Sequence, residues 1–286
     1  ERDMNSFDTP RIFASGPGIC NGVCQFPLKT SPNIVSLEYL PLTSKLKNVL
    51  PKALREHKRR KIDVLKIYAD SEPGTEVYSL SQLKELVNWA HTKDILVASH
   101  SIYKSSVLNS INAGVDSIEH GYNLDQEIIK KLAKSKIFLV PTDISLKTNR
   151  LLNTRRKKPS SEDFLLKLDK KRKKRLYDAY KAGVQISGAT DLYADFQKMG
   201  LDIGHHALET IIHYSESGIP NKEVLRMFTI NSSILLRQPK LGRIEVGAFA
   251  DFVAVAGDPL NNMSDIRNVS FVMKNGHILL NKTNPK

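Results

Sequence analysis

Four ionisable side chains lie in, or at the end of, short apolar runs of the sequence. Lys66 lies inside VLKIYA, His100 closes ILVASH, and His120 lies near the end of DSIEHG. Asp191 closes a fourth run, VQISGATD. Amine, imidazole and carboxylate groups can bind a divalent metal ion or transfer protons. A single histidine at a strand end is more often structural, so the prediction of a site depends on the set of four.

Lys66 is the least expected member of this set, because its neighbours are apolar. Burying an ammonium group is unfavourable unless the group is paired or modified. A buried amine also has a lowered pKa, which makes it nucleophilic enough to react with carbon dioxide. The carbamate so formed is an anionic oxygen ligand that can bridge two metal ions. Two histidines and an aspartate complete a site suited to Zn²⁺, with Asp191 taking the proton of a metal-activated water.

The elements that would position these side chains are short strands alternating with helices. Runs rich in Ile, Val and Leu, typical of buried parallel strands, occupy residues 11–15, 64–69, 95–100, 116–121, 137–142 and 184–191. Helical patterns occupy residues 79–92, 105–114, 125–135, 161–182, 207–218 and 221–236. The alternation predicts a parallel α/β fold, as a barrel or an open sheet. In a barrel the four side chains would meet at the C-terminal ends of the strands.

The residues after Leu236 follow a different pattern, with short apolar runs separated by turns. The Asn275-Gly276 pair between two such runs is a strong hairpin signal. We therefore predict a parallel α/β region at residues 1–236 and a small antiparallel β unit at residues 237–286.

A family pattern extends over nearly the whole chain. Its most specific phrases are AGVDSIEHG at 113–121 and LGRIEVGAFADFVAVAGDPL in the tail, and it includes LKIYA at 65–69, VASH at 97–100 and GATDLYAD at 188–195. The pattern resembles the amidohydrolase superfamily, in particular its imidazolonepropionase-like branch with the metal-dependent Xaa-Pro dipeptidases (prolidases). The resemblance implies a (β/α)8 TIM barrel of the metal-dependent hydrolase type, with the tail joining a β-sandwich.

The resemblance also implies roles for the four side chains. Lys66 would be the carbamylated bridging ligand, and His100 and His120 would bind one metal ion. Asp191 would be a further ligand and the general base. The implied cofactor is a divalent metal, Zn²⁺ in first place, and the implied reaction is hydrolysis of a C–N bond.

The substrate implied by the resemblance is a small amide or dipeptide. Tyr193 and Asp195, in the loop after Asp191, are candidate substrate-binding residues, with an ordinary polar loop as the alternative. Tyr68 is a third candidate. No nucleic-acid or membrane partner is expected, and a homo-oligomer is compatible with the sequence. The compartment stays open between the cytoplasm and the periplasm or secretion.

One departure from the family pattern bears on activity. The family carries an H-x-H pair on its first strand, and no two of the eight histidines here have that spacing. The first strand, most of the second and the N-terminal half of the sandwich are therefore expected to be missing from this chain. The site would then hold one ion or none, and a catalytically inactive truncated remnant is the alternative function.

A basic segment suggests a third function, nucleic-acid binding. The chain has a formal charge of +13, and residues 147–175 hold 13 Lys and Arg against 3 Asp and Glu. The excess charge is thus local. Phe164 is the only aromatic residue of the segment, and no motif that enters a groove of DNA is present. These features favour a solvated helix face over an anion-attracting rim at the barrel mouth, and over nucleic-acid or membrane binding.

His205 and His206 are a less promising pair of metal ligands. Adjacent residues of a helix point about 100° apart and rarely share a metal ion. We therefore predict that they form the solvated start of a helix.

Overall fold

The computed structural model describes residues 10–15, 18–20, 40–41, 62–70, 78–191 and 203–282. It divides into two units, which we describe separately. The sheet unit comprises Phe13–Pro141 and Ala182–Gln185, and the helix-rich unit comprises Glu1–Ile12, Thr142–Lys181 and Ile186–Lys286. The boundary expected at residue 236 stays a prediction. No helix in the described ranges is long and apolar enough to cross a membrane.

The sheet unit is built on a parallel β-sheet with the strand order β2-β1-β3-β4-β5-β6. Its strands are β1 (Ile19–Cys20), β2 (Leu40–Pro41), β3 (Val64–Tyr68), β4 (Leu96–Ser101), β5 (Ser117–His120) and β6 (Phe138–Val140). The four strands predicted between residues 64 and 142 are confirmed, and their order in the chain is their order in the sheet. The run at 11–15 contributes only an isolated bridge, from Ser15 to Val64.

The strand expected at residues 184–191 does not form in the described backbone. Within this run Ile186 alone forms a bridge, and beside it the Leu139 N–H donates to the Gln185 carbonyl at 2.8 Å. Farther along, the Gly188 N–H donates to the Met227 carbonyl at 2.9 Å. The backbone of this run therefore bonds to the end of a helix instead of continuing a strand ladder.

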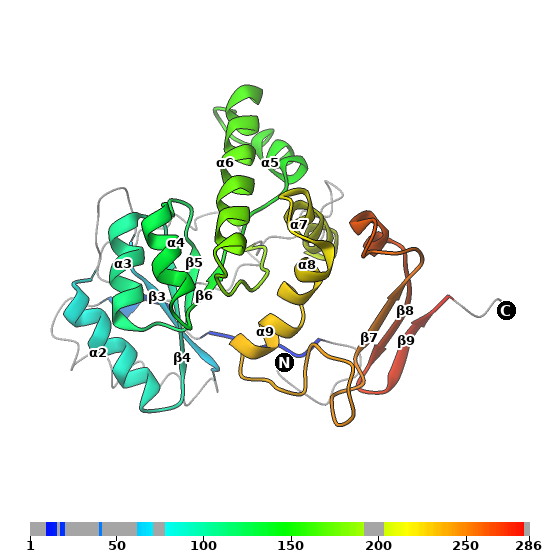
Figure 1. Ribbon diagram of the computed structural model, residues 1–286, viewed down its shortest axis with the longest axis horizontal. Helices are drawn as coiled ribbons and strands as arrows, with labels where there is room; N and C mark the ends of the chain where they lie inside the picture. Colours follow the sequence, from blue (N-terminus) through cyan, green and yellow to red (C-terminus); the bar gives the residue numbers. More distant parts are fainter. Residues whose placement is uncertain are drawn as a thin grey trace. The chain divides into compact units, whose positions relative to one another are not determined.

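Three helices follow the strands of the sheet unit, and α3 lies between α2 and α4 (Figure 1). They are α2 (Leu80–His91), α3 (Lys104–Ala113) and α4 (Gln126–Ala133). Ser79 and Gln82 form a capping box at the start of α2. Gly114, with φ of 81°, ends α3 in the left-handed conformation that glycine adopts readily. These signals explain why the predicted helices agree closely with the observed ones.

The helix-rich unit contains five α-helices in its described part, followed by a three-stranded antiparallel sheet (Figure 1). The helices are α5 (Leu146–Asn153), α6 (Glu162–Lys181), α7 (Ile203–Glu216), α8 (Asn221–Met227) and α9 (Ile230–Leu235). The sheet consists of β7 (Phe252–Val255), β8 (Val269–Lys274) and β9 (His277–Asn281), with a 3-10 helix η2 (Met263–Arg267) before β8.

Two predictions for this unit have different outcomes. The single helix expected at 221–236 is interrupted between α8 and α9. The antiparallel tail is confirmed, and its hairpin turns at Asn275 and Gly276, with φ of 49° and 82°. Positive φ at both central residues is the signature of the turn type that matches the strand twist.

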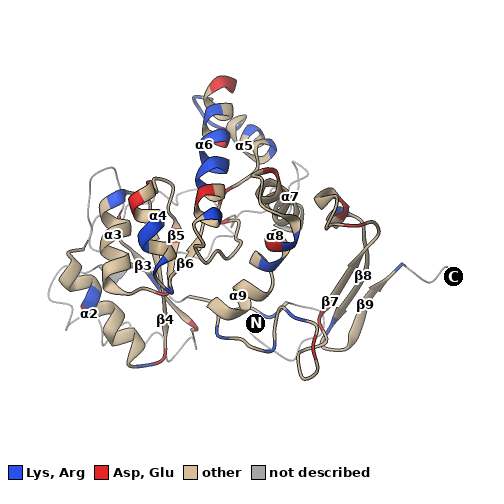
Figure 2. Cartoon of the chain, viewed as in Figure 1, with Lys and Arg blue, Asp and Glu red and all other residues tan. Residues whose placement is uncertain are grey.

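Lys and Arg residues recur along the ribbon of α6 (Figure 2). Exposed lysines confirm the predicted solvated face at Lys167, Lys170, Lys171 and Lys174. The prediction is wrong for the inner face, because α6 packs against α5 and α7. On that face Arg175 is buried and donates a hydrogen bond to Asp143, which is also buried.

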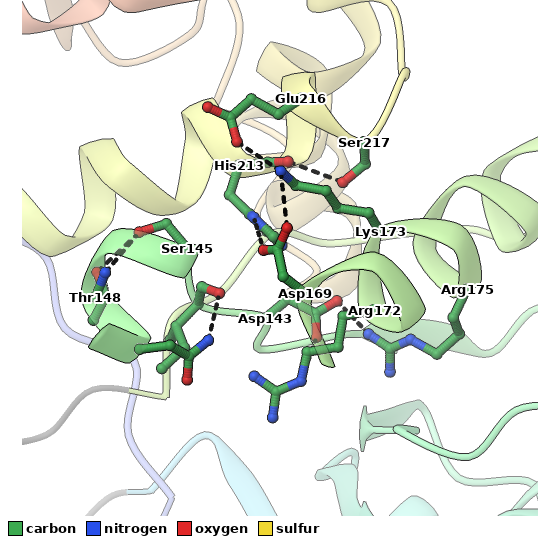
Figure 3. Close-up of polar contacts among 12 residues, drawn as sticks. Asp143, Ser145, Thr148, Asp169, Arg172, Lys173, Arg175, His213, Glu216 and Ser217 are labelled. Atoms are coloured by element: carbon green, nitrogen blue, oxygen red, sulfur yellow. Dashed lines mark hydrogen bonds and ion pairs between the residues drawn. The ribbon is translucent and has the colours of Figure 1, made fainter. Parts of the chain in front are cut away.

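The inner face of α6 is held by further ion pairs (Figure 3). Lys173 lies between Asp169 and Glu216, with Nζ–O distances of 3.2 and 2.8 Å. The buried ring of His213 on α7 places Nδ1 3.6 Å from an Asp169 oxygen. The basic segment therefore helps to join α6 to α7.

His205 and His206 also have different environments. His205 is exposed, as predicted, whereas His206 is fully buried. The His206 Nδ1 lies 3.4 Å from the Thr148 hydroxyl on α5, and burial lowers the pKa of the ring. The prediction of a solvated helix start is thus wrong for His206, which packs inside the unit.

Candidate active site

The register of β3 against β4 places three side chains on one face of the parallel sheet. Tyr68 pairs with His100, and Lys66 pairs with Ala98 two positions earlier. Register partners on neighbouring strands face the same side, and side chains alternate along each strand. Lys66, Tyr68 and His100 therefore share one face at the C-terminal end of the sheet.

His120 joins this group through an unusual backbone conformation. The register pairs it with Ser101, so strand alternation alone would turn it away from His100. His120 has φ of 74°, in the left-handed region that residues other than glycine seldom adopt. Its ring lies with its centroid 4.4 Å from that of His100, at 71° between the ring planes. Such strained residues cluster at functional sites.

Lys66 lies between two fully buried residues, Leu65 and Ile67, but is itself only half-buried. Its Nζ atom is 5.7 Å from the centre of the Tyr68 ring, which in turn is 5.3 Å from the His100 ring. The expectation of a fully buried amine is corrected accordingly. Carbamylation of Lys66 stays a prediction.

The environment of His100 keeps its imidazole uncharged. Burial, together with the positive charge of Lys66, lowers the pKa of His100 to about 3. An imidazole that is neutral at pH 7 retains a lone pair for a metal ion. Asp70, two residues beyond the end of β3, places Oδ1 3.4 Å from Nε2 of His100.

The sequence patterns did not identify Asp70 and Tyr122 as residues of the site. Asp70 is a polar residue just past a strand end, so the rule that identified His100 would also have identified it. The Tyr122 ring centroid lies 5.3 Å from that of His120. No sequence signal separates Tyr122 from an ordinary loop tyrosine, and the backbone between the two rings has positive φ at both His120 and Gly121.

The donor chemistry at this edge of the sheet fits a zinc-type ion. Two imidazoles in contact, with an amine on the same face that can become a carbamate, supply nitrogen and oxygen donors of the kinds that Zn²⁺ binds. Within the described ranges, no three His, Cys, Asp or Glu residues are grouped closely enough to hold a metal ion. The role of Lys66 as a third donor stays a prediction.

Three further residues were predicted for the site: Asp191, Tyr193 and Asp195. Asp191 belongs to the helix-rich unit, where it is exposed and has φ of 54°. Its roles as metal ligand and general base stay predictions. Tyr193 and Asp195 fall outside the described residues.

The neutral state of His100 predicts a stability that falls in acid. The folded pKa of about 3 lies below the ordinary value of 6.5. The unfolded chain therefore takes up a proton first, and stability is lost as pH falls from 6.5 towards 3, by about 1 kcal/mol per pH unit. Urea unfolding at pH 7 and pH 5 should show a smaller loss in His100→Gln than in the wild type. Equal losses in both proteins would contradict the assignment, and His205→Gln, at an exposed position, is the control.

Comparison with known proteins places the chain in a family. The family model described as "Amidohydrolase family" matches residues 14–279. An ochratoxinase of Aspergillus niger is 26% identical over 239 residues, which cover 79% of this chain and 48% of the relative. The chain thus spans about half the length of this curated relative.

Solved structures share the fold. A Xaa-Pro dipeptidase with methionine bound in its active site superposes with a TM-score of 0.75 at 24% identity, covering 95% of this chain and 68% of the other. A putative prolidase from Bifidobacterium longum gives a TM-score of 0.70 at 22% identity, covering 97% and 68%. The parallel sheet and the separate antiparallel tail therefore share the fold of these solved structures. Since the family model matches well over half of its residues, this chain belongs to the amidohydrolase family.

Proposed function

We propose that this chain is a metal-dependent hydrolase of amide C–N bonds. The observation that carries the proposal is the contact between the His100 and His120 rings on the sheet face that also bears Lys66. The ring centroids are 4.4 Å apart. Membership of the amidohydrolase family supports the same class of reaction.

The site residues would divide the work as follows. His100 and His120 would hold a divalent ion through ring nitrogens, and carbamylated Lys66 would add an oxygen donor. Such an ion, when bound, supplies Lewis acidity and makes water nucleophilic at neutral pH. Asp191 accepts the proton of the attacking water and passes it to the leaving nitrogen. Tyr68, in contact with His100, lines the substrate side of the site.

A dipeptide with a C-terminal proline is the substrate class to test first. Two of the solved structures with this fold are a Xaa-Pro dipeptidase and a prolidase bound to N-methylphosphonate-L-proline. Their names suggest the class, and the loop residues Tyr193 and Asp195 are proposed to select within it.

The test combines metal analysis with turnover in the purified full chain. We expect about one zinc ion per chain, hydrolysis of at least one member of an Xaa-Pro panel, loss of turnover with a chelator, and recovery with added Zn²⁺. A chain that is folded by circular dichroism but contains no metal and hydrolyses none of the panel would instead support the inactive alternative.

A further inference from the structure

Asp70 is a buried carboxylate whose two oxygens face different partners. Its Oδ2 accepts hydrogen bonds from the Ile102 N–H at 2.7 Å, from the Tyr103 N–H at 3.0 Å and from the Ser106 hydroxyl. Tyr103 is the N-cap residue of α3 and makes no side-chain cap bond of its own. This oxygen therefore caps α3 from a different element of the fold.

The other oxygen, Oδ1, faces His100. It is buried, it accepts no hydrogen bond among the described residues, and it lies 3.4 Å from the His100 Nε2. The side chain of Asp70 is 2% exposed and that of His100 is 11% exposed. An ionised carboxylate can only accept hydrogen bonds. The favourable arrangement is therefore one in which Nε2, the ring nitrogen 3.4 Å from this oxygen, carries the proton.

The position of this proton determines which nitrogen can bind a metal ion. A neutral imidazole has one N–H and one lone pair, so a proton on Nε2 leaves the lone pair on Nδ1. Carboxylates that hold the second nitrogen of a ligating histidine set its tautomer and raise its basicity. We propose that Asp70 is a positioning residue that holds His100 as the Nε2–H tautomer and so presents Nδ1 to the metal ion of the proposed hydrolase.

The substitution Asp70→Asn separates this role from helix capping. The asparagine oxygen can keep the three bonds to residues 102, 103 and 106, while its NH₂ group replaces the oxygen that faces His100. An N–H donor at that place pairs with a lone pair on Nε2 and moves the proton to Nδ1. Asp70→Asn should thus preserve the hydrogen bonds at the start of α3 and change the tautomer of His100 from Nε2–H to Nδ1–H.

The chain contains a matched control. The Asp116 Oδ2 contacts the His91 Nε2 at 2.8 Å and also accepts the Val97 N–H at 2.7 Å. Asp116→Asn therefore changes a second aspartate that combines a histidine contact with a backbone bond, outside the proposed site.

The primary readout is the ¹⁵N NMR spectrum of the histidine rings in the metal-free chain, with the His100 signals assigned by their loss in His100→Gln. We expect Nε2–H in the wild type and in Asp116→Asn, and Nδ1–H in Asp70→Asn. An Nδ1–H tautomer in the wild type would overturn the proposal, even if Asp70→Asn did not fold.

The second readout is the affinity for Zn²⁺ alone, measured by competition with a chromophoric chelator. We expect Asp70→Asn to bind about 10–100-fold more weakly than the wild type, and Asp116→Asn to bind equally well. If a folded Asp70→Asn bound Zn²⁺ as tightly as the wild type, Asp70 would act only as a helix cap and the proposal would be overturned. This proposal rests on the proposed function only because it assumes that His100 binds a metal ion. A wild-type chain that binds no Zn²⁺ would contradict the proposed function. The tautomer of His100 in the metal-free chain tests the role of Asp70 independently.

Discussion

The substitution Lys66→Ala is expected to remove bound metal and amide hydrolysis together. Lys66 is the member of the site whose chemistry must change before it can bind, because an ammonium group has no lone pair. As a carbamate it would supply the oxygen donor that the two histidines lack. Polarisation of a carbonyl by a metal ion is worth several kcal/mol, so we expect kcat/KM to fall by roughly a thousandfold or more.

Chemical rescue makes this prediction specific to a carboxylate-like donor. A short carboxylic acid such as propionate can enter the space vacated by the lysine stem and offer two oxygens. We expect added propionate to restore part of the zinc content of Lys66→Ala. A ¹³C signal for the carbamate, seen when the wild type is equilibrated with labelled bicarbonate, should be absent from the variant.

The control for Lys66→Ala is Lys170→Ala, which removes an exposed lysine from α6. It should leave zinc content, turnover and the carbamate signal unchanged. A Lys66→Ala chain that kept its zinc and its turnover would show that the site has been assigned to the wrong residues.

Much of the sheet unit could be predicted from local patterns. The runs that became β3, β4, β5 and β6 are short and apolar, and the helices between them carry recognisable caps at Ser79 and Asp125. Because consecutive parallel strands lie side by side, chain order alone predicts that Lys66, His100 and His120 approach one another. Apolar runs, helix caps and the pairing of consecutive strands can all be read from the sequence, and here they predicted these strands and helices correctly.

The finer geometry of the site depends on features that no sequence pattern encodes. Strand alternation would turn His120 away from His100, yet the two rings are in contact and the backbone of His120 is left-handed. Asp70 contacts His100 because the end of β3 lies beside the start of α3, a tertiary relation. At residues 184–191 the apolar pattern of a strand was present, yet the Gly188 N–H bonds to a helix end instead.

The number of Lys and Arg residues in the basic segment does not show which of them are exposed, because a helix has an outer and an inner face. Counting Lys and Arg between residues 147 and 175 treats each as solvated, whereas the periodicity of α6 turns Asp169 and Arg175 inwards. Arg175 then meets Asp143, which lies on a different segment of the chain, between β6 and α5. A long-range ion pair of this kind can be seen only in the folded structure, and it carries a large expected effect.

Removing the Asp143 carboxylate is expected to destabilise the helix-rich unit by about 3–5 kcal/mol. Asp143 is fully buried, it accepts a hydrogen bond from Arg175, and its Oδ1 lies 3.8 Å from the Arg172 Nε (Figure 3). Asp143→Leu leaves two guanidinium groups with no shared anion in a desolvated place. Differential scanning calorimetry should show a fall in Tm of about 6–15 °C.

A double-mutant cycle tests whether the penalty comes from the uncompensated charge and not from lost packing. Arg175→Met alone leaves the buried Asp143 beside the more distant Arg172, so it too should be strongly destabilising. Combining Asp143→Leu with Arg175→Met replaces the pair by apolar groups, and the combined loss should be well below the sum of the single losses.

Lys167→Met breaks the exposed Lys167–Asp163 pair on the same helix and should change stability by less than about 0.5 kcal/mol. Additive losses in the cycle would mean that each side chain acts through its own packing, and the ion pair would then contribute little to joining α6 to the segment that follows β6.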